Sequence, residues 1–182
     1  NEITSALFGY GSFDQVSVKN AGLALYYFSF GLPAFALIKV FSSFLFARHN
    51  TKTPFYISVV SVLVNIILSI SLFGKYGFII IPISTSISSW LNAFVLYIYL
   101  INKKHFIFLK DFYLFFIKLL FSCTVMSIVF KNLLNIFSNN LVYSSNTKLF
   151  YMIIIVLITF VVYLFISIIT KAFKISDINL KY

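Results

Sequence analysis

The sequence predicts an all-α fold, a polytopic membrane bundle of about five transmembrane helices. Hydrophobic residues make up 61% of the 182 residues and charged residues only 10%, whereas an ordinary soluble domain is about half apolar and about a quarter charged. The apolar residues form long stretches, and the charged residues fall in short segments between them. This pattern is typical of membrane-spanning helices. Many tyrosines lie near the ends of the stretches, where amphipathic rings favour the lipid headgroup layer.

Five stretches are long enough to cross a bilayer, which takes about 20 mostly apolar residues. They cover residues 21–46, 55–73, 78–101, 112–130 and 149–170. In the first stretch, Gly31 and Pro33 interrupt the helical pattern, because proline removes a backbone hydrogen bond and glycine allows a close helix contact. We therefore predict a kink there, which is either a hinge or a packing feature.

The chain divides into three segments. Residues 1–20 are interpreted as the end of a preceding helix and an extracytoplasmic turn, with Ser12 or Asp14 capping the next helix. Residues 21–101 are predicted to form an up-down-up unit of three helices, because short loops imply antiparallel neighbours. Residues 102–182 supply two C-terminal transmembrane helices and a tail. The first residue is Asn rather than Met, so we expect a piece of a longer protein whose upstream part is missing.

Positive charge alternates from loop to loop and predicts the orientation of the spans. Lys- and Arg-rich loops favour the cytoplasmic side and meet anionic lipid there. The predicted cytoplasmic segments contain Arg48, His49 and Lys52, then Lys103, Lys104, His105 and Lys110, then Lys171, Lys174 and Lys181. The predicted outer loops contain Lys75, and Lys131 with Lys148. The net charge of +10 is thereby explained by topology, and no basic face suited to nucleic acid is seen.

The turn after the first span has its own chemistry. Arg48 and Lys52 are expected to hold it on the cytoplasmic side. Thr53 is predicted to cap the next helix with Pro54 as its first residue, where the missing proline N–H costs nothing. On the opposite side, the sequence GKYG is predicted to form a tight turn through its two glycines.

Polar residues inside the spans are the candidates for function. Lys39 either reaches the interface with its long side chain or lines a cavity. Asn65 and Ser69 are four residues apart and share one helix face. The third span opens with the hydroxyl-rich sequence IPISTSISSW, in which Thr85 can face Asn65 and Ser69. Such residues either pack helices together or offer oxygens to a cation, although two helices alone supply few ligands for Na⁺.

Catalytic residues are not evident in the sequence, and we expect no enzyme. His49 and His105 lie in loops without a paired nucleophile or metal-ligand spacing. Cys123 stands alone in an apolar stretch and is interpreted as a small core residue. The four acidic residues all lie outside the spans, so a carboxylate proton relay within the membrane is not supported.

Three segments carry a family resemblance. They read ALFGYGSF, then YYFSFGLPAFALIKVFSSFLFARHNTKTP, then VSVLVNIILSISLFGKYGFIIIPISTSISSWLNAFVLY. In this order, over residues 6–100, they resemble the late helices of the MurJ (MviN) family of bacterial lipid II flippases, within the larger group of multidrug, oligosaccharidyl-lipid and polysaccharide exporters. The five spans would correspond to helices ten to fourteen of a fourteen-helix protein in the bacterial inner membrane, with a cytoplasmic C-terminus.

The resemblance implies a function for particular residues. The family moves lipid II, an undecaprenyl-pyrophosphate-linked disaccharide-pentapeptide, between leaflets by alternating access. A cation site known in some members falls here on Asn65, Ser69, Ile81 and Thr85, with possible Na⁺ as the only cofactor, but Ser69 stands where the family pattern has an acidic residue. The last two spans would form a groove for the lipid tail. A related polysaccharide-lipid or multidrug exporter, or a membrane scaffold that transports nothing, remains an alternative.

Overall fold

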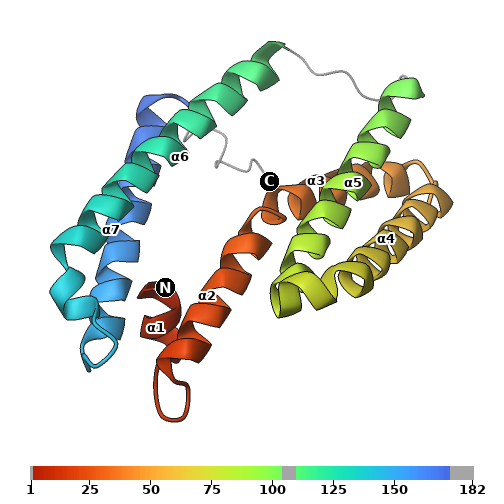
Figure 1. Cartoon of the computed structure of the whole chain (residues 1–182). Coiled ribbons are helices and arrows are strands. Elements are labelled where there is room, and N and C mark those ends of the chain that lie inside the picture. The colour runs from red at the N-terminus through yellow and green to blue at the C-terminus, as the bar shows by residue number, and fades with distance from the viewer. Residues whose placement is uncertain (1, 104–109, 173–182) are drawn as a thin grey trace. The chain divides into compact units, whose positions relative to one another are not determined.

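The computed structural model describes residues 2–103 and 110–172 of the chain (Figure 1). In these ranges it contains seven α-helices, two short 3-10 helices and no strand, which confirms the all-α class. Contacts divide the chain into two compact units, residues 19–107 and residues 1–18 with 108–182, and each is described by itself. The predictions for Lys104, His105, Lys174 and Lys181, and for the side chain of Lys110, fall outside the described residues.

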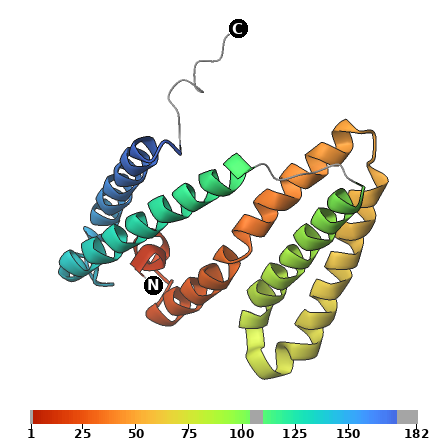
Figure 2. The ribbon, with the colours of Figure 1, turned by 90° about the horizontal axis from the view of Figure 1, so that it is seen from above.

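The first unit contains most of α2 (Gln15–Ser29), with α3 (Leu32–Ala47), α4 (Lys52–Tyr76) and α5 (Ile80–Asn102). The helices α4 and α5 run antiparallel as a hairpin (Figure 2), joined by η1 (Gly77–Ile79). Gly77 has a φ of 60°, so it supplies the tight turn expected of GKYG, whereas Gly74 lies within α4. The helix α3 packs against α5 around a core of Phe41, Leu45, Leu96 and Leu100.

The predicted kink of residues 21–46 is a break between two helices. The helices α2 and α3 end and begin on either side of Phe30 and Gly31 and are bent by 40°. Pro33 is the second residue of α3, where its missing N–H needs no helical partner. The helix α2 begins at Gln15, earlier than the apolar stretch, because the Asp14 carboxylate accepts the Ser17 N–H at 2.8 Å and caps it. The prediction of Asp14 as a cap is confirmed.

The turn between α3 and α4 differs from its prediction. The helix α4 begins at Lys52, so Pro54 is its third residue rather than its first. Thr53 is not the cap, since the Asn50 Oδ1 accepts the Thr53 N–H at 3.2 Å. The Asn50 Nδ2 also donates to the Tyr99 hydroxyl at 3.2 Å, a tertiary contact that local sequence rules do not include. Arg48 lies over the Phe44 ring, 4.6 Å from its centre.

The second unit contains α1 (Glu2–Phe8), α6 (Lys110–Ile136), η2 (Ser138–Leu141) and α7 (Lys148–Ile169). The helices α6 and α7 lie side by side (Figures 1 and 2), and α1 packs against α7. Their core consists of Ala6, Leu141, Met152 and Ile155. The helix α6 extends six residues beyond the predicted end at Phe130, so Lys131 belongs to a helix and not to the outer loop. Lys148 likewise is the first residue of α7.

Several described helices can cross a membrane. By length and composition, three stretches qualify, Lys52–Asn102, Tyr113–Ile136 and Lys148–Ile169, and the bent pair α2–α3 would make a fourth. The first of them folds back on itself as α4 and α5, of 25 and 23 residues, and each is long enough alone. Large apolar side chains remain exposed along the helices, among them Ile70, Ile136 and Phe165. Such a surface suits lipid rather than water.

Candidate functional site: a polar seam between two membrane helices

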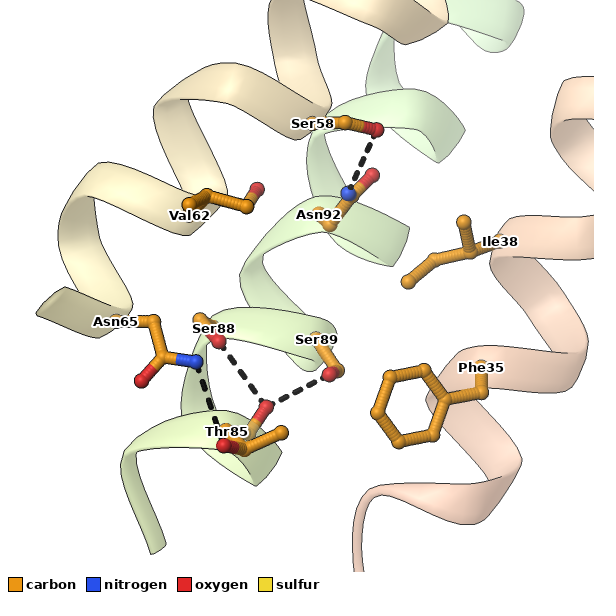
Figure 3. A pocket seen from close by; sticks show the side chains of 10 residues that line it. Phe35, Ile38, Ser58, Val62, Asn65, Thr85, Ser88, Ser89 and Asn92 are labelled. Carbon is orange, nitrogen blue, oxygen red and sulfur yellow. Dashed lines mark hydrogen bonds between the residues drawn. The ribbon is translucent and has the colours of Figure 1, made fainter. Parts of the chain in front are cut away.

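The helices α4 and α5 meet through a polar seam made of Asn65, Ser69, Ser84 and Thr85. The Asn65 Nδ2 donates to the Thr85 Oγ1 at 3.3 Å (Figure 3). The Asn65 Oδ1 accepts from the hydroxyls of Ser69 at 3.1 Å and Ser84 at 2.9 Å, and these two hydroxyl oxygens are 2.6 Å apart. The structure therefore brings Asn65, Ser69 and Thr85 together, which is one of the two arrangements considered from the sequence, and adds Ser84.

The backbone carbonyl of Ile81 completes this arrangement. It accepts from the Ser84 hydroxyl at 3.0 Å and from the Thr85 hydroxyl at 2.8 Å. The Asn65 Oδ1 thus accepts from Ser69 and the Ile81 carbonyl accepts from Thr85, while the one Ser84 hydroxyl hydrogen goes to either acceptor at a time. The seam contains no carboxylate. Interhelical hydrogen bonds of this kind stabilise a membrane helix pair by about 0.6 kcal/mol each. As it stands, the seam suits a hydrogen-bonded helix contact and lacks the charged oxygen that a hard cation favours.

The break between α2 and α3 is held by α5. The Ser86 hydroxyl donates to the Tyr27 carbonyl at 2.7 Å, and the Trp90 indole N–H donates to the Phe30 carbonyl at 2.8 Å. The Tyr27 carbonyl belongs to the last turn of α2 and the Phe30 carbonyl to the break that follows it, where backbone carbonyls lack helical partners. Gly31 is buried, and a Cβ there would lie 3.0 Å from the Ser86 Oγ. The helices can approach so closely because residue 31 has no side chain.

Lys39 is exposed on α3 and lies outside the polar seam. It follows Phe35 by four residues, so the two share one helix face. Arg48 and Lys52 are also exposed, whereas Pro54 is buried. Within the part of the chain that the structure describes, no group of three or more His, Cys, Asp and Glu side chains could hold a metal ion.

Sequence reasoning missed Lys148, the most deeply buried lysine or arginine among the residues that the structure describes. The Lys148 side chain is 2% exposed, and its ammonium donates to the Gly9 carbonyl at 2.6 Å and to the Tyr143 carbonyl at 2.8 Å. The same ammonium lies 4.2 Å from the centre of the Tyr10 ring and 4.7 Å from that of Tyr143. We call this set the lysine clasp. The only local signal for it is that Lys148 directly starts an apolar helix.

The lysine clasp joins segments that are far apart in the sequence. It ties the start of α7 to the turn between α1 and α2, and the Tyr143 hydroxyl adds a bond to the Phe13 carbonyl at 2.7 Å. A buried ammonium is costly unless hydrogen bonds and aromatic faces stabilise its charge. The clasp supplies both, so it fixes the position of the α1–α2 turn against α7.

The fold and the polar seam define a class, the polytopic helical membrane proteins whose helices pack through hydroxyl and amide side chains. Within this class, the comparison with known families is specific. A family model described as "Lipid II flippase MurJ" matches residues 1–152. The chain belongs to the MurJ family. The match confirms the resemblance and extends it beyond residue 100, into α6 and the start of α7.

Individual relatives agree with this assignment. The probable lipid II flippase MurJ of Rickettsia prowazekii (strain Madrid E) is 34% identical over 128 residues, which are 70% of this chain and 25% of the relative. That of Rhizobium meliloti (strain 1021) is 36% identical over 103 residues, 57% of this chain and 19% of the relative. That of Buchnera aphidicola subsp. Baizongia pistaciae (strain Bp) is 28% identical over 148 residues, 80% and 27%. The chain spans about a quarter of the length of the relatives it matches, or less.

Proposed function

We propose that the protein containing this chain is a transporter, not an enzyme, that moves lipid II from the inner to the outer leaflet of the bacterial inner membrane. The family match over residues 1–152 is the observation that carries the proposal. The apolar helices add physical support. A polar pyrophosphate-linked headgroup cannot cross about 30 Å of hydrocarbon unaided, and rocking of two helical lobes exposes a shielded cavity to each side in turn.

In this proposal the chain supplies part of the second lobe. The apolar outer faces of α6 and α7, with exposed residues such as Phe121, Phe160 and Phe165, would hold the lipid tail in contact with membrane lipid. The headgroup would be gripped with the help of an N-terminal lobe of the same protein. Sodium binding at Asn65, Ser69, Ile81 and Thr85 stays a prediction, which a sodium-dependent rise in melting temperature, removed by Asn65→Ala, would check.

Depletion of the intact protein in cells tests the function directly. Lipid II should then accumulate in the inner leaflet, and the outer leaflet should lose it, as measured by accessibility of lipid II to a reagent added from outside. Normal outward movement of lipid II in depleted cells, with no second flippase present, would contradict the proposal. In liposomes, the purified intact protein should expose lipid II to the same reagent, whereas liposomes without it should not.

Lys39 provides a sharper test within this chain. An exposed ammonium in a membrane helix lines a cavity or reaches the headgroups. If it contributes to the transport cavity, Lys39→Ala lowers lipid II transport partially while membrane insertion stays normal. The measurement compares lipid II transport in two liposome preparations, one with the variant and one with the same amount of unmodified protein. Unchanged transport would mean that Lys39 only reaches the interface.

A further inference from the structure

A polar pocket lies between α3, α4 and α5 inside the first unit. Its volume is about 250 Å³, far more than the about 30 Å³ of one water molecule. Residues with hydroxyl or amide side chains line the pocket from two helices at helical spacing. They are residues 58, 61 and 65 of α4 and residues 85, 88, 89 and 92 of α5. Spacings of three, four and seven residues place side chains on one helix face. Hydroxyl- and amide-bearing residues of both helices therefore line this side of the pocket, which we call the polar wall, although carbon atoms make up most of the surface that it presents.

The pocket has a second, apolar wall. Figure 3 shows Phe35 and Ile38 pointing from α3 toward α5, opposite the hydroxyl and amide groups. No charged side chain lines the pocket among the residues that the structure describes. One aromatic face opposite several hydrogen-bonding groups suits a ligand that is itself apolar on one side and hydroxylated on the other.

The polar wall offers acceptors rather than donors. The hydroxyls of Ser88 and Ser89 donate to the Thr85 carbonyl at 3.0 and 2.6 Å. The Ser61 hydroxyl donates to the Ile57 carbonyl at 2.9 Å. Because these hydrogens are used within their own helices, the oxygen lone pairs remain to accept bonds. A matching guest must bring hydrogen-bond donors.

The side-chain oxygen of Asn92 also lacks a hydrogen-bond donor within the part of the chain that the structure describes. Its side chain is 7% exposed, and its Oδ1 is buried without a hydrogen-bond partner among the described residues. Its Nδ2 donates to the Ser58 Oγ over a long distance of 3.3 Å, so the carboxamide is loosely held and can turn about its broad last torsion. Exchanging the amide nitrogen and oxygen would still leave one end unpaired. A buried amide group without a partner is costly, and turning the carboxamide toward a guest hydroxyl would remove that cost.

The hydrocarbon of a membrane limits which surroundings can contact the polar wall of the pocket. Hydrocarbon cannot pair the unsatisfied Asn92 carboxamide, so this side of the pocket faces protein or a water-filled cavity and not lipid. We propose that this pocket, which we call the α3–α5 pocket, binds one neutral, hydroxylated ring of the transported headgroup, namely a sugar unit. Phe35 contacts the C–H face of the ring, and Asn92 with the serine oxygens accepts from its hydroxyls. This inference rests on the proposed function and assigns the sugar part of the headgroup to α3, α4 and α5.

Protection of a cysteine in the α3–α5 pocket tests the inference. In the intact protein, with native cysteines replaced, Val62→Cys places a thiol in the pocket lining. A water-soluble maleimide should label it, and lipid II should slow this labelling. Undecaprenyl pyrophosphate, which has the same tail and phosphates but no sugar, should not. Adding Asn92→Leu should weaken the protection by lipid II about threefold to tenfold, the loss of about one hydrogen bond.

Two controls separate the pocket from general effects. Lys75→Cys lies in the last turn of α4 and should be labelled at one rate with or without either lipid. Asn132→Leu makes the matched substitution on an exposed position of α6 and should leave the protection of Val62→Cys unchanged. If the thiol of Val62→Cys fails to react, the pocket is covered in the intact protein. If both lipids protect this thiol equally, the pocket does not distinguish a lipid with sugar from one without it. Either result overturns the inference.

Direct binding of lipid II, measured in the same samples, distinguishes this inference from the proposed function. If lipid II binds and is transported but leaves the Val62 thiol unprotected, the sugar site is wrong and the flippase function stands. If lipid II neither binds nor is transported, the proposed function fails, and the sugar site fails with it.

Discussion

At the scale of single residues, Lys148 and Asn92 show how this chain treats buried polar groups. The Lys148 ammonium is buried but meets two carbonyls and two rings, so its charge is stabilised. The Asn92 carboxamide is buried with one atom unpaired. In an apolar protein a satisfied group gives stability, whereas an unsatisfied group points to a ligand.

Replacing Lys148 tests the lysine clasp. Lys148→Met keeps the apolar stem and removes the ammonium, leaving the Gly9 and Tyr143 carbonyls without their donor. We expect a loss of about 2 kcal/mol in stability and faster hydrogen exchange across residues 9–13 and 138–147. Lys131→Met, an exposed position of α6, is the matched control and should change neither. Equal exchange in both variants would show that the clasp does not hold the turn.

Asp14 gives a pH-dependent prediction. The Ser17 N–H bonded to its carboxylate lowers the pKa of Asp14 below its ordinary value. A lowered folded-state pKa means that the cap stabilises α2 fully above the ordinary value of about 3.9 and is lost as the pH falls through the lowered pKa. Exchange of the Ser17 amide should be faster in Asp14→Ala than in the unmodified protein at pH 7, and this difference should shrink in acid. A difference that is the same at every pH would contradict the role of the carboxylate.

At the scale of elements, the break between α2 and α3 depends on a neighbour as much as on its own residues. Gly31 and Pro33 permit the break, but Ser86 and Trp90 of α5 satisfy the carbonyls that it frees. Such satisfaction is required where a helix is interrupted inside a membrane. The break is therefore a packed feature of the first unit, and the polar seam continues the same use of small hydroxylated residues along α5.

Two identical substitutions should have opposite effects. Gly31→Ala places a methyl group 3.0 Å from the Ser86 Oγ and should destabilise the protein by about 1–3 kcal/mol, because the helices must separate. Gly74→Ala lies within α4 with no atom within 4 Å of the added Cβ and should stabilise by up to about 1 kcal/mol. Melting temperatures of the purified variants in one detergent give the comparison. A stabilising Gly31→Ala would show that the close approach is not needed.

At the scale of the whole molecule, contacts within each unit show which loops lie at the same end of that unit. The Asn50–Tyr99 bond places the turn at residues 48–52 near the end of α5 and Lys103, while Lys75 lies at the far end of the hairpin, about 35 Å away at 1.5 Å per residue. In the second unit, the lysine clasp places residues 9–14 beside residues 138–148. Both groupings match the sides that positive charge predicts.

Cysteine labelling in intact cells tests this topology. Lys52→Cys and Lys103→Cys should react only with a reagent that reaches the cytoplasm. Lys75→Cys and Asn146→Cys should react with an impermeant reagent added outside. Labelling of positions 52 and 75 from one side would contradict the hairpin of α4 and α5 as a transmembrane pair and, with it, the proposed function.

Sequence by itself determined the helical membrane class, the five apolar stretches, the break near Gly31 and the family. These follow from composition, from helix length and from local chemistry such as the Asp14 cap, which involve residues close together in the chain. It also placed Asn65 and Ser69 on one face of a helix, because residues four apart share a face, and it offered Thr85 as a residue that can face them.

Only the tertiary structure decided which polar groups are paired. Lys148 is placed in a loop by local rules, yet a turn 139 residues earlier in the chain buries it. Thr53 has the right residue type to cap α4, but its own N–H is bonded to the side chain of Asn50, which Tyr99 anchors. The roles of Ser84 and Asn92 depend on the residues of α4 opposite them, Asn65 and Ser58. Hydrogen bonding and burial depend on distance in space, and local sequence patterns do not fix that distance between remote segments.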